Sequence, residues 1–391
     1  MRFMPAQQFA ALWPTAYFDE SFFRKRTLKL FDENADHRLT SLARSGISET
    51  IRRALASAGL DTGSGPMKGV TDTIEHALSA AGLTQRSESR DVRGMTIDIP
   101  APRRGEFLEH SFSSAAGSRK YKVYTPTGYS TSSNEPVPMI VMLHGCTQSP
   151  DDFAAGTRMN ALADQHGFVV AYPAQPAKAN AQKCWNWFRS EDQARDSGEP
   201  ALIAGITREV ARSHGVDDRR IFVAGMSAGA AMAVVLGATY PDLFAAVGAH
   251  SGLPYKAAHD MPSALGAMHG VAAPDQATSN AIPTIVFHGD NDHTVAAGNA
   301  TAIVAQASGR RPGALLQRQA TTDTAAGGRK YTRTDYIDES GRVQVEQWIV
   351  HGAGHAWSGG SAAGSFTDAR GPDASKEIIR FFYSVARAGS A

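Results

Sequence analysis

Short apolar runs that alternate with helical segments constrain the fold of this chain more than any other feature. Residues 139–143 and 221–224 contain no alternating polar positions, which is typical of strands buried on both faces of a mostly parallel sheet. Segments of helical length lie between such runs, as in α/β proteins. We therefore predict an α/β fold with a doubly wound, mostly parallel sheet, whose ligands bind at the carboxyl ends of the strands.

The individual elements are predicted from apolar periodicity and turn residues. Strands are expected at 106–112, 120–124, 138–143, 167–171, 220–224, 245–249 and 283–287, followed by a hairpin of 330–337 and 343–350. Helices are expected at 151–166, 200–214, 228–240, 296–308 and 373–386. These elements predict one catalytic domain over residues 105–391, preceded by an N-terminal helical extension over residues 1–104.

Two similar segments characterise the N-terminal extension. Residues 50–60 and 73–83 both read Thr-Ile-x-x-Ala-Leu-x-x-Ala-Gly-Leu, with a glycine suited to the left-handed end of a helix. Two short amphipathic helices are predicted, and neither can bury its apolar face alone. They either pack on the main domain or serve in docking or self-association.

The charge balance excludes two classes of partner. Lys and Arg number 39 and Asp and Glu 38, so the net charge is +1, and no long-range field attracts nucleic acid or an anionic membrane. No apolar run approaches the roughly 18 residues of a spanning helix. We therefore expect a neutral substrate, no nucleic acid and no membrane span.

The strongest chemical signal is the run Gly225-Met226-Ser227-Ala228-Gly229. A buried strand precedes it and an alanine-rich helix follows it, which is the setting of a nucleophilic serine on a sharp strand-to-helix turn. A serine hydroxyl needs a base and an orienting carboxylate, and in this arrangement they follow in the order Ser, Asp, His.

Residues downstream supply both partners. Asp292 follows the strand 283–287 and is the predicted acid, with Asp290 as the alternative. His355 lies in a glycine-rich loop and is the predicted base, whereas His351 closes a strand and is predicted to be structural. A metal site of Asp290, Asp292 and His293 has too few oxygen ligands for a hard cation. We expect no metal and no cofactor.

Two backbone N–H groups are predicted to form an oxyanion hole. One belongs to Ala228, directly after the serine, and the other to Cys146, in the loop that follows the strand 138–143. Cys146 and Cys184 are the two cysteines of the chain. A disulfide between them would fix this loop, and two buried free thiols are the alternative.

Five ordered motifs together resemble a known family. They are His144-Gly-Cys-Thr-Gln148, Cys184-Trp-Asn-Trp-Phe188, the serine motif, His288-Gly-Asp-Asn-Asp292 and Gly354-His-Ala-Trp-Ser-Gly-Gly360. The chain thus resembles the esterases and polyhydroxybutyrate depolymerases of the α/β-hydrolase fold, which border the feruloyl and acetylxylan esterases. The resemblance implies a triad of Ser227, Asp292 and His355 acting on short-chain polyhydroxyalkanoates or their oligomers. A carbohydrate esterase and a non-catalytic binding protein are the alternatives.

The resemblance also implies expectations about substrate contacts and location. Trp185, Trp187 and Trp357 are predicted either to form an apolar wall for a hydroxyacyl chain or simply to pack in the core. The first thirty residues do not read as a secretory signal, so a cytoplasmic location is expected, with the extracellular location of related depolymerases as the alternative. No polymer-binding domain follows the last predicted helix, which favours soluble oligomers, amorphous granules or small esters.

Overall fold

The computed structural model describes residues 105–130, 135–270, 282–309 and 316–386. The chain divides into two units, Met1–Ile97 and Asp98–Ala391, and the description below concerns the second. The two predicted N-terminal helices, 50–60 and 73–83, lie outside the described residues.

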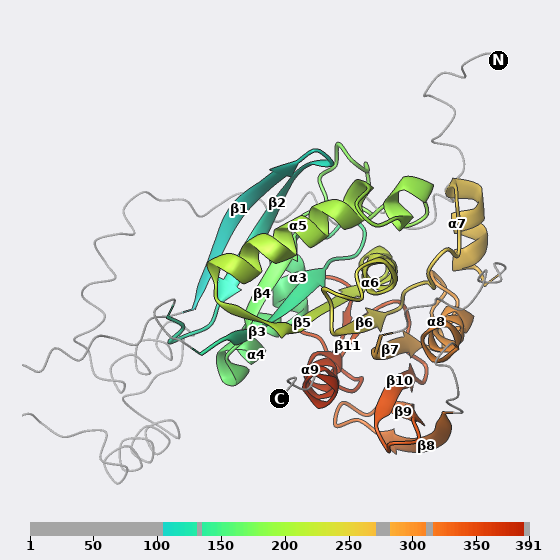
Figure 1. Ribbon diagram of the computed structural model, residues 1–391. Coiled ribbons are helices and arrows are strands. Elements are labelled where there is room, and N and C mark those ends of the chain that lie inside the picture. The colour runs from blue at the N-terminus through green and yellow to red at the C-terminus, as the bar shows by residue number, and fades with distance from the viewer. Residues whose placement is uncertain (1–104, 131–134, 271–281, 310–315, 387–391) are drawn as a thin grey trace, which may run out of the picture. The chain divides into compact units, whose positions relative to one another are not determined.

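The second unit contains a ten-stranded sheet in the order β1-β2-β4-β3-β5-β6-β7-β10-β9-β8 (Figure 1). The strands are β1 (Glu106–Ser114), β2 (Gly117–Thr125), β3 (Val137–Leu143), β4 (Val169–Pro173), β5 (Val216–Met226), β6 (Ala246–His250), β7 (Thr284–Gly289), β8 (Gln317–Thr324), β9 (Lys330–Ile337) and β10 (Val343–Val350). The six central strands, from β4 to β10, pair in parallel, and the outer strands pair antiparallel. The prediction of a mostly parallel α/β sheet is therefore confirmed.

Helices cover both faces of this sheet. They are α3 (Pro150–Thr157), α4 (Met159–His166), α5 (Gly198–Ser213), α6 (Ala228–Thr239), α7 (Met261–Met268), α8 (Gly298–Ser308) and α9 (Ala374–Val385), with a 3₁₀ turn η5 (Ser190–Gln193). α5 and α6 pack on one face and α3, α4 and α9 on the other (Figure 1). None of the helices in this part of the chain is long and apolar enough to cross a membrane.

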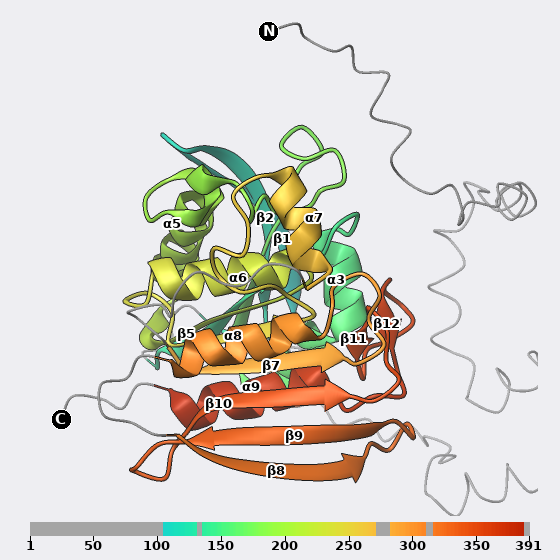
Figure 2. The ribbon, with the colours of Figure 1, turned by 90° about the vertical axis from the view of Figure 1, so that its right-hand side faces the viewer.

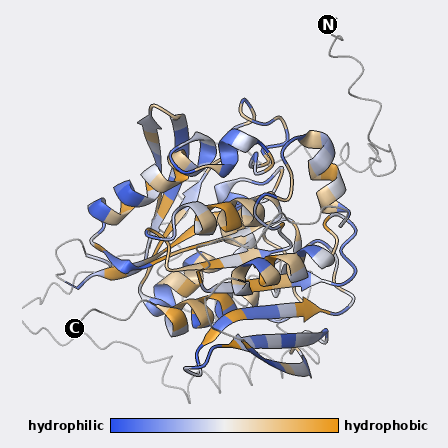
Figure 3. Ribbon diagram, turned by 45° about the vertical axis from the view of Figure 1, so that its right-hand side comes forward, coloured by the Kyte–Doolittle hydropathy of each residue, from blue (hydrophilic) through white to orange (hydrophobic). Residues whose placement is uncertain are grey.

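The apolar runs of the central strands account for the two-faced core. Met139, Val141 and Leu143 of β3 belong to the cluster beneath α5 and α6, whereas Ile140 and Met142 belong to the opposite cluster. All five side chains are fully buried. Because successive side chains of a strand point to opposite faces, a continuous apolar run supplies both cores at once. Hydrophobic residues accordingly gather in the interior of the ribbon in Figure 3.

The structure differs from the predicted elements in two informative places. The single helix expected at 151–166 is two helices, because Arg158 between them adopts a φ of 55°. The Arg158 guanidinium donates hydrogen bonds to the carbonyl of Gly359 and to Asp373, so this break joins the helices to a distant loop. Strand β8 was not predicted, because all eight of its residues are exposed and it shows no apolar alternation.

A small parallel pair, β11 (Trp357–Ser358) and β12 (Thr367–Asp368), lies apart from the main sheet. Figure 2 shows this pair at the end of the sheet toward which the arrows of β7 and β10 point. The loops that follow the parallel strands meet at this same end, as the sequence predicts for the ligand site.

Candidate active site

Ser227 occupies the turn between β5 and α6 in a strained conformation. Its φ of 56° and ψ of −122° lie in a region that residues other than glycine rarely adopt. The Ser227 N–H donates to the carbonyl of His250 at 2.9 Å, which fixes the turn. A partly exposed serine on a turn of this kind presents its hydroxyl above the ends of the strands.

The two glycines of the serine motif allow a close crossing of backbones. A Cβ at Gly229 would lie 2.1 Å from the carbonyl oxygen of Leu143, and one at Gly225 would lie 2.4 Å from the backbone of Gly229. No side chain fits at either position without moving the main chain. The sequence pattern Gly-x-Ser-x-Gly is therefore required here by the packing of β3, β5 and α6.

Asp292 and His355 lie together at the ends of β7 and β10. Oδ2 of Asp292 accepts a hydrogen bond from Nδ1 of His355 at 2.7 Å. Oδ1 of Asp292 accepts from the N–H groups of Thr294 and Val295, both at 2.9 Å. The carboxylate is buried while the imidazole of His355 retains 13% of its surface exposed. This arrangement holds the ring by one nitrogen and leaves the other nitrogen available.

The surroundings of Asp292 keep it ionised. Burial alone raises the pKa of this carboxyl. Hydrogen bonds from His288 and His355 and from the N–H of Val295 lower the pKa by more than burial raises it, so it lies well below its ordinary value. His288 begins the motif that contains Asp292, but no role was predicted for it. Its Nε2 lies 2.8 Å from the carbonyl oxygen of Val295 and 3.5 Å from Oδ2 of Asp292. This buried ring therefore contacts the Asp292 loop at both its acid and its backbone.

Asp290 has a different partner from Asp292. Its Oδ2 lies 2.8 Å from Nδ1 of His351, and its Oδ1 accepts from the N–H of Gly352 at 2.6 Å. The Nε2 of His351 in turn lies 2.9 Å from the hydroxyl of Thr332. The structure thus places Asp290 and His351 in a separate, half-exposed pair.

The loop after β3 passes close to Ser227. A Cβ at Gly145 would lie 3.6 Å from Cβ of Ser227, and the Gly145 N–H donates to Oε1 of Gln148 at 2.9 Å. Among the described residues, the N–H groups of Cys146 and Ala228 have no hydrogen-bond acceptor. One of these unpaired donors directly follows Ser227 in the chain, and the other directly follows Gly145, which lies beside the serine.

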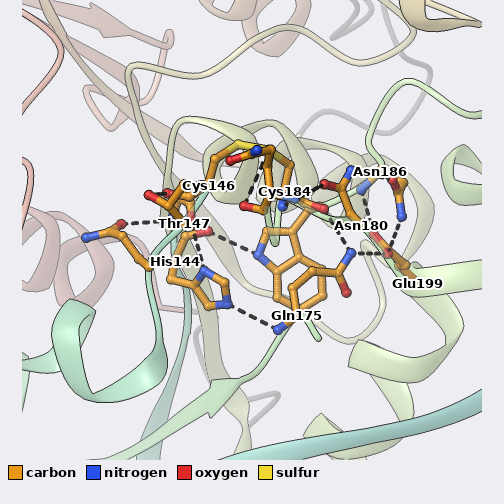
Figure 4. Close-up of a disulfide and its surroundings, with 12 residues drawn as sticks. His144, Cys146, Thr147, Gln175, Asn180, Cys184, Asn186 and Glu199 are labelled. Carbon is orange, nitrogen blue, oxygen red and sulfur yellow. Dashed lines mark hydrogen bonds between the residues drawn. A yellow bond between two sulfur atoms is a disulfide. The ribbon is translucent and has the colours of Figure 1, made fainter. Parts of the chain in front are cut away.

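A disulfide joins Cys146 to Cys184, with their Cα atoms 4.2 Å apart (Figure 4). The neighbouring Trp185 donates from Nε1 to the carbonyl of His144 at 3.1 Å. His144 is buried, which lowers its pKa to about 4. The ring is therefore neutral: Nδ1 donates to the carbonyl of Gly145 and Nε2 accepts from the N–H of Gln175.

Behind the disulfide, a buried carboxylate gathers several donors. Glu199 accepts hydrogen bonds from the backbone and side-chain amides of Asn186, at 2.7 and 2.8 Å, and from Gln175 at 2.5 Å. Arg119 also donates to it at 3.3 Å. Figure 4 shows Gln175 and Asn186 converging on Glu199 beneath the loop that carries Cys184. Sequence reasoning missed this network, since Glu199 carries no local motif.

The predicted tryptophan wall is corrected by the burial of these side chains. Trp185 and Trp357 are fully buried, and Trp187 is nearly so. Trp357 stacks on His250 and donates from Nε1 to the hydroxyl of Ser375. Side chains without solvent-accessible surface cannot touch a bound substrate, so the alternative of simple packing describes Trp185 and Trp357.

Comparison with known proteins adds a family likeness. A family model described as esterase PHB depolymerase matches residues 119–329. Poly(3-hydroxyalkanoate) depolymerase C of Paucimonas lemoignei is 35% identical over 231 residues, covering 56% of this chain and 54% of that protein. Acetylxylan esterase A of Aspergillus oryzae is 32% identical over 136 residues, covering 34% of this chain and 42% of that protein. The chain spans about half the length of the depolymerases it matches.

Solved structures show the same fold. An acetyl xylan esterase from Aspergillus awamori superposes with a TM-score of 0.55 at 18% identity, covering 72% of this chain and all of that one. At this identity the likeness concerns the α/β-hydrolase fold.

Proposed function

Because the chain belongs to the esterase and polyhydroxybutyrate depolymerase family, we propose that it is a serine esterase with short-chain polyhydroxyalkanoates, or their oligomers, as substrates. The observation that carries this proposal is the hydrogen bond between Asp292 and His355 at the same end of the sheet as the strained Ser227. Nucleophile, acid and base then follow one another along the chain as Ser227, Asp292 and His355, which is the order of α/β hydrolases.

The proposed reaction is acyl transfer. Nε2 of His355 removes the proton of Ser227 as the Ser227 oxygen attacks the ester carbonyl, and the N–H groups of Cys146 and Ala228 stabilise the oxyanion. The carbonyl re-forms, and the alcohol leaves with the proton held by His355. Water, deprotonated by the same imidazole, then attacks the acyl carbonyl, and the acid is released as His355 returns that proton to the Ser227 oxygen. Asp292 stays ionised throughout and stabilises the imidazolium.

Replacement of the serine tests the reaction. Ser227→Ala should abolish hydrolysis of p-nitrophenyl butyrate and labelling by a fluorophosphonate, while the exposed Ser190→Ala should retain both. Turnover that survives in Ser227→Ala would refute the proposal. Absence of fluorophosphonate labelling in the wild-type protein would instead favour a non-catalytic binding protein on a hydrolase scaffold.

The second candidate is a carbohydrate esterase. It is favoured by the similarity to an acetylxylan esterase over 136 residues. The near-zero net charge suits neutral esters of either kind. Hydroxybutyrate oligomers, acetylated xylan and methyl ferulate, compared as substrates at equal enzyme concentration, separate the two candidates by their kcat/KM.

A further inference from the structure

Phe366 is an aromatic side chain that the protein exposes in a strained conformation. It is 47% exposed, and its φ of 52° lies in the left-handed region that bulky residues rarely adopt. A single exposed apolar residue is ordinary on a protein surface. The strain is not ordinary, because it persists only where the surrounding structure imposes it, and such positions cluster at functional sites.

The segment that carries His355 holds the backbone of Phe366 from one side. The N–H of Trp357, two residues after His355, donates to the carbonyl of Phe366 at 2.7 Å. The next residue, Thr367, pairs with Trp357 in the two-stranded β11–β12 sheet. Since the Trp357 side chain is buried, the strand that holds the Phe366 backbone is itself anchored in the core.

Side chains of α3 and of the loop that follows β3 hold the preceding residue, Ser365, from the other side. The N–H and hydroxyl of Ser365 donate to the two carboxylate oxygens of Asp152, at 2.9 and 2.6 Å. Nε2 of Gln148 donates to Asp152 at 2.7 Å, and the carbonyl of Ser365 lies 3.3 Å from the same nitrogen. Oε1 of Gln148 accepts from Gly145, so one side chain connects Ser365 to the loop beside Ser227.

The segment before Phe366, residues 360–364, packs with its backbone directly against α3. A Cβ at Gly364 would lie 2.3 Å from the carbonyl oxygen of Asp152, and one at Gly360 would lie 2.9 Å from that of Gly156. Ser361 also donates from its N–H to Gly156 at 2.8 Å. The β11–β12 pair stands at the carboxyl end of the parallel strands (Figure 2), on the side where Ser227 and His355 lie.

We propose that Phe366 is a specificity-determining residue whose ring contacts the apolar chain of the bound ester beyond the scissile carbonyl. The inference rests on the proposed esterase function. An aromatic ring at this place favours esters whose chains are long enough to reach it, and it adds nothing for an acetyl group. The enzyme therefore prefers esters with a chain of several carbons, such as a hydroxyacyl unit, to acetate esters.

Acyl chain length is the variable that tests the proposal. For p-nitrophenyl acetate, butyrate and hexanoate, Phe366→Ala should lower the ratio of kcat/KM between longer esters and acetate by about fourfold for each methylene that loses contact. Hydrolysis of acetate should stay within about twofold. Tyr383→Ala is the matched control, because Tyr383 is an exposed aromatic of α9, and its chain-length profile should equal that of the wild type.

A second variant separates contact from folding. Phe366→Gly accepts the positive φ without strain, so its melting temperature should equal or exceed that of Phe366→Ala while the preference for longer chains is lost. Phe366→Tyr, which keeps an aromatic ring at this position, should retain the wild-type preference for longer chains. Unchanged chain-length profiles in both the Ala and Gly variants, or an equal loss on acetate and hexanoate, would overturn the proposal. Failure of the esterase function itself would appear separately, as an absence of hydrolysis of all three esters by the wild-type protein.

Discussion

The carboxylate of Asp290 lies 2.8 Å from Nδ1 of His351, in a second acid–histidine pair beside that of Asp292 and His355. Both pairs join the loop that follows β7 to the loop that follows β10. The N–H of Asn291 also donates to the carbonyl of Ala353 between them. The half-exposed pair thus holds the two loops in register, and the buried Asp292 fixes the orientation of the His355 ring.

The two acids should differ sharply in their effect on catalysis. Asp292→Asn leaves His355 without an ionised partner and should lower kcat by about 10⁴-fold. Asp290→Asn loses an exposed contact worth about 1 kcal/mol, so kcat should fall by less than about tenfold. Steady-state kinetics on p-nitrophenyl butyrate measure both values. A larger loss in Asp290→Asn than in Asp292→Asn would assign the roles the other way.

The Cys146–Cys184 disulfide should stabilise the protein and support the rate. Its partners are 38 residues apart in sequence, and closing a loop of this size typically contributes about 2–4 kcal/mol. The Cys146→Ser, Cys184→Ser double variant should therefore unfold at lower urea concentration. Its kcat should also fall, by up to the 10²–10³-fold that loss of one oxyanion donor costs, because the loop bearing the Cys146 N–H is no longer tethered.

Thiol titration provides the control for this prediction. Denatured, unreduced wild-type protein should contain no free thiol, and reduction should release two. Two thiols before reduction would contradict the disulfide.

Two glycines in helices should respond in opposite ways to alanine. Gly229→Ala places a Cβ 2.1 Å from the carbonyl of Leu143, whereas a Cβ at Gly266 in α7 meets nothing within 4 Å. Gly229→Ala should lower the melting temperature and the kcat together, since the turn at Ser227 must shift. Gly266→Ala should stabilise by about 0.5–1 kcal/mol. Thermal unfolding checks both, and a neutral Gly229→Ala would contradict the close crossing of β3 and α6.

Much of the fold and the triad candidates followed from local sequence signals. Burial on both faces of the sheet accounts for the apolar runs at 139–143 and 221–224. The five ordered motifs also reflect local requirements, such as room for a backbone crossing. The break at Arg158 did not follow because it depends on distant partners, and the strand β8 did not follow because its exposed residues show no apolar alternation. Arg158 binds Gly359 and Asp373, some 200 residues away, and β8 is defined by pairing with β9.

The hydrogen-bond network behind the Cys146–Cys184 disulfide was equally beyond the sequence. Glu199 lies in the first turn of α5, yet its hydrogen bonds reach Gln175, Asn186 and Arg119. A buried carboxylate is stable only when several donors surround it, and no spacing rule connects these positions. The tryptophan wall failed for a related reason: aromatic side chains next to a catalytic residue can point into the core, as Trp357 does.

Two buried histidines should make the fold sensitive to acid. Burial lowers the pKa of His144 to about 4, and burial with nearby His288 and His355 lowers that of His250 to about 3. Between these values and the unfolded value of 6.5, the unfolded state binds a proton that the folded state does not. Stability should therefore fall as pH decreases through this window, by about 2 kcal/mol for each ring between pH 7 and 5.

Urea unfolding at pH 7 and pH 5 measures this difference. His250→Asn should show a smaller pH dependence than the wild type, although its stability at pH 7 is lower. The exposed His166→Gln serves as the control and should keep the wild-type dependence. Equal unfolding free energies at the two pH values in the wild type would contradict the neutral state of both rings.

Strand β8 has a consequence for how these molecules behave at high concentration. It closes one edge of the ten-stranded sheet and carries only exposed residues, with Arg318 and Asp323 of opposite charge along its length. An edge strand with free backbone donors and acceptors invites a second sheet to extend it, and charged, polar side chains discourage this. The same lack of large apolar side chains that hid β8 in the sequence thus protects the sheet against edge-to-edge aggregation.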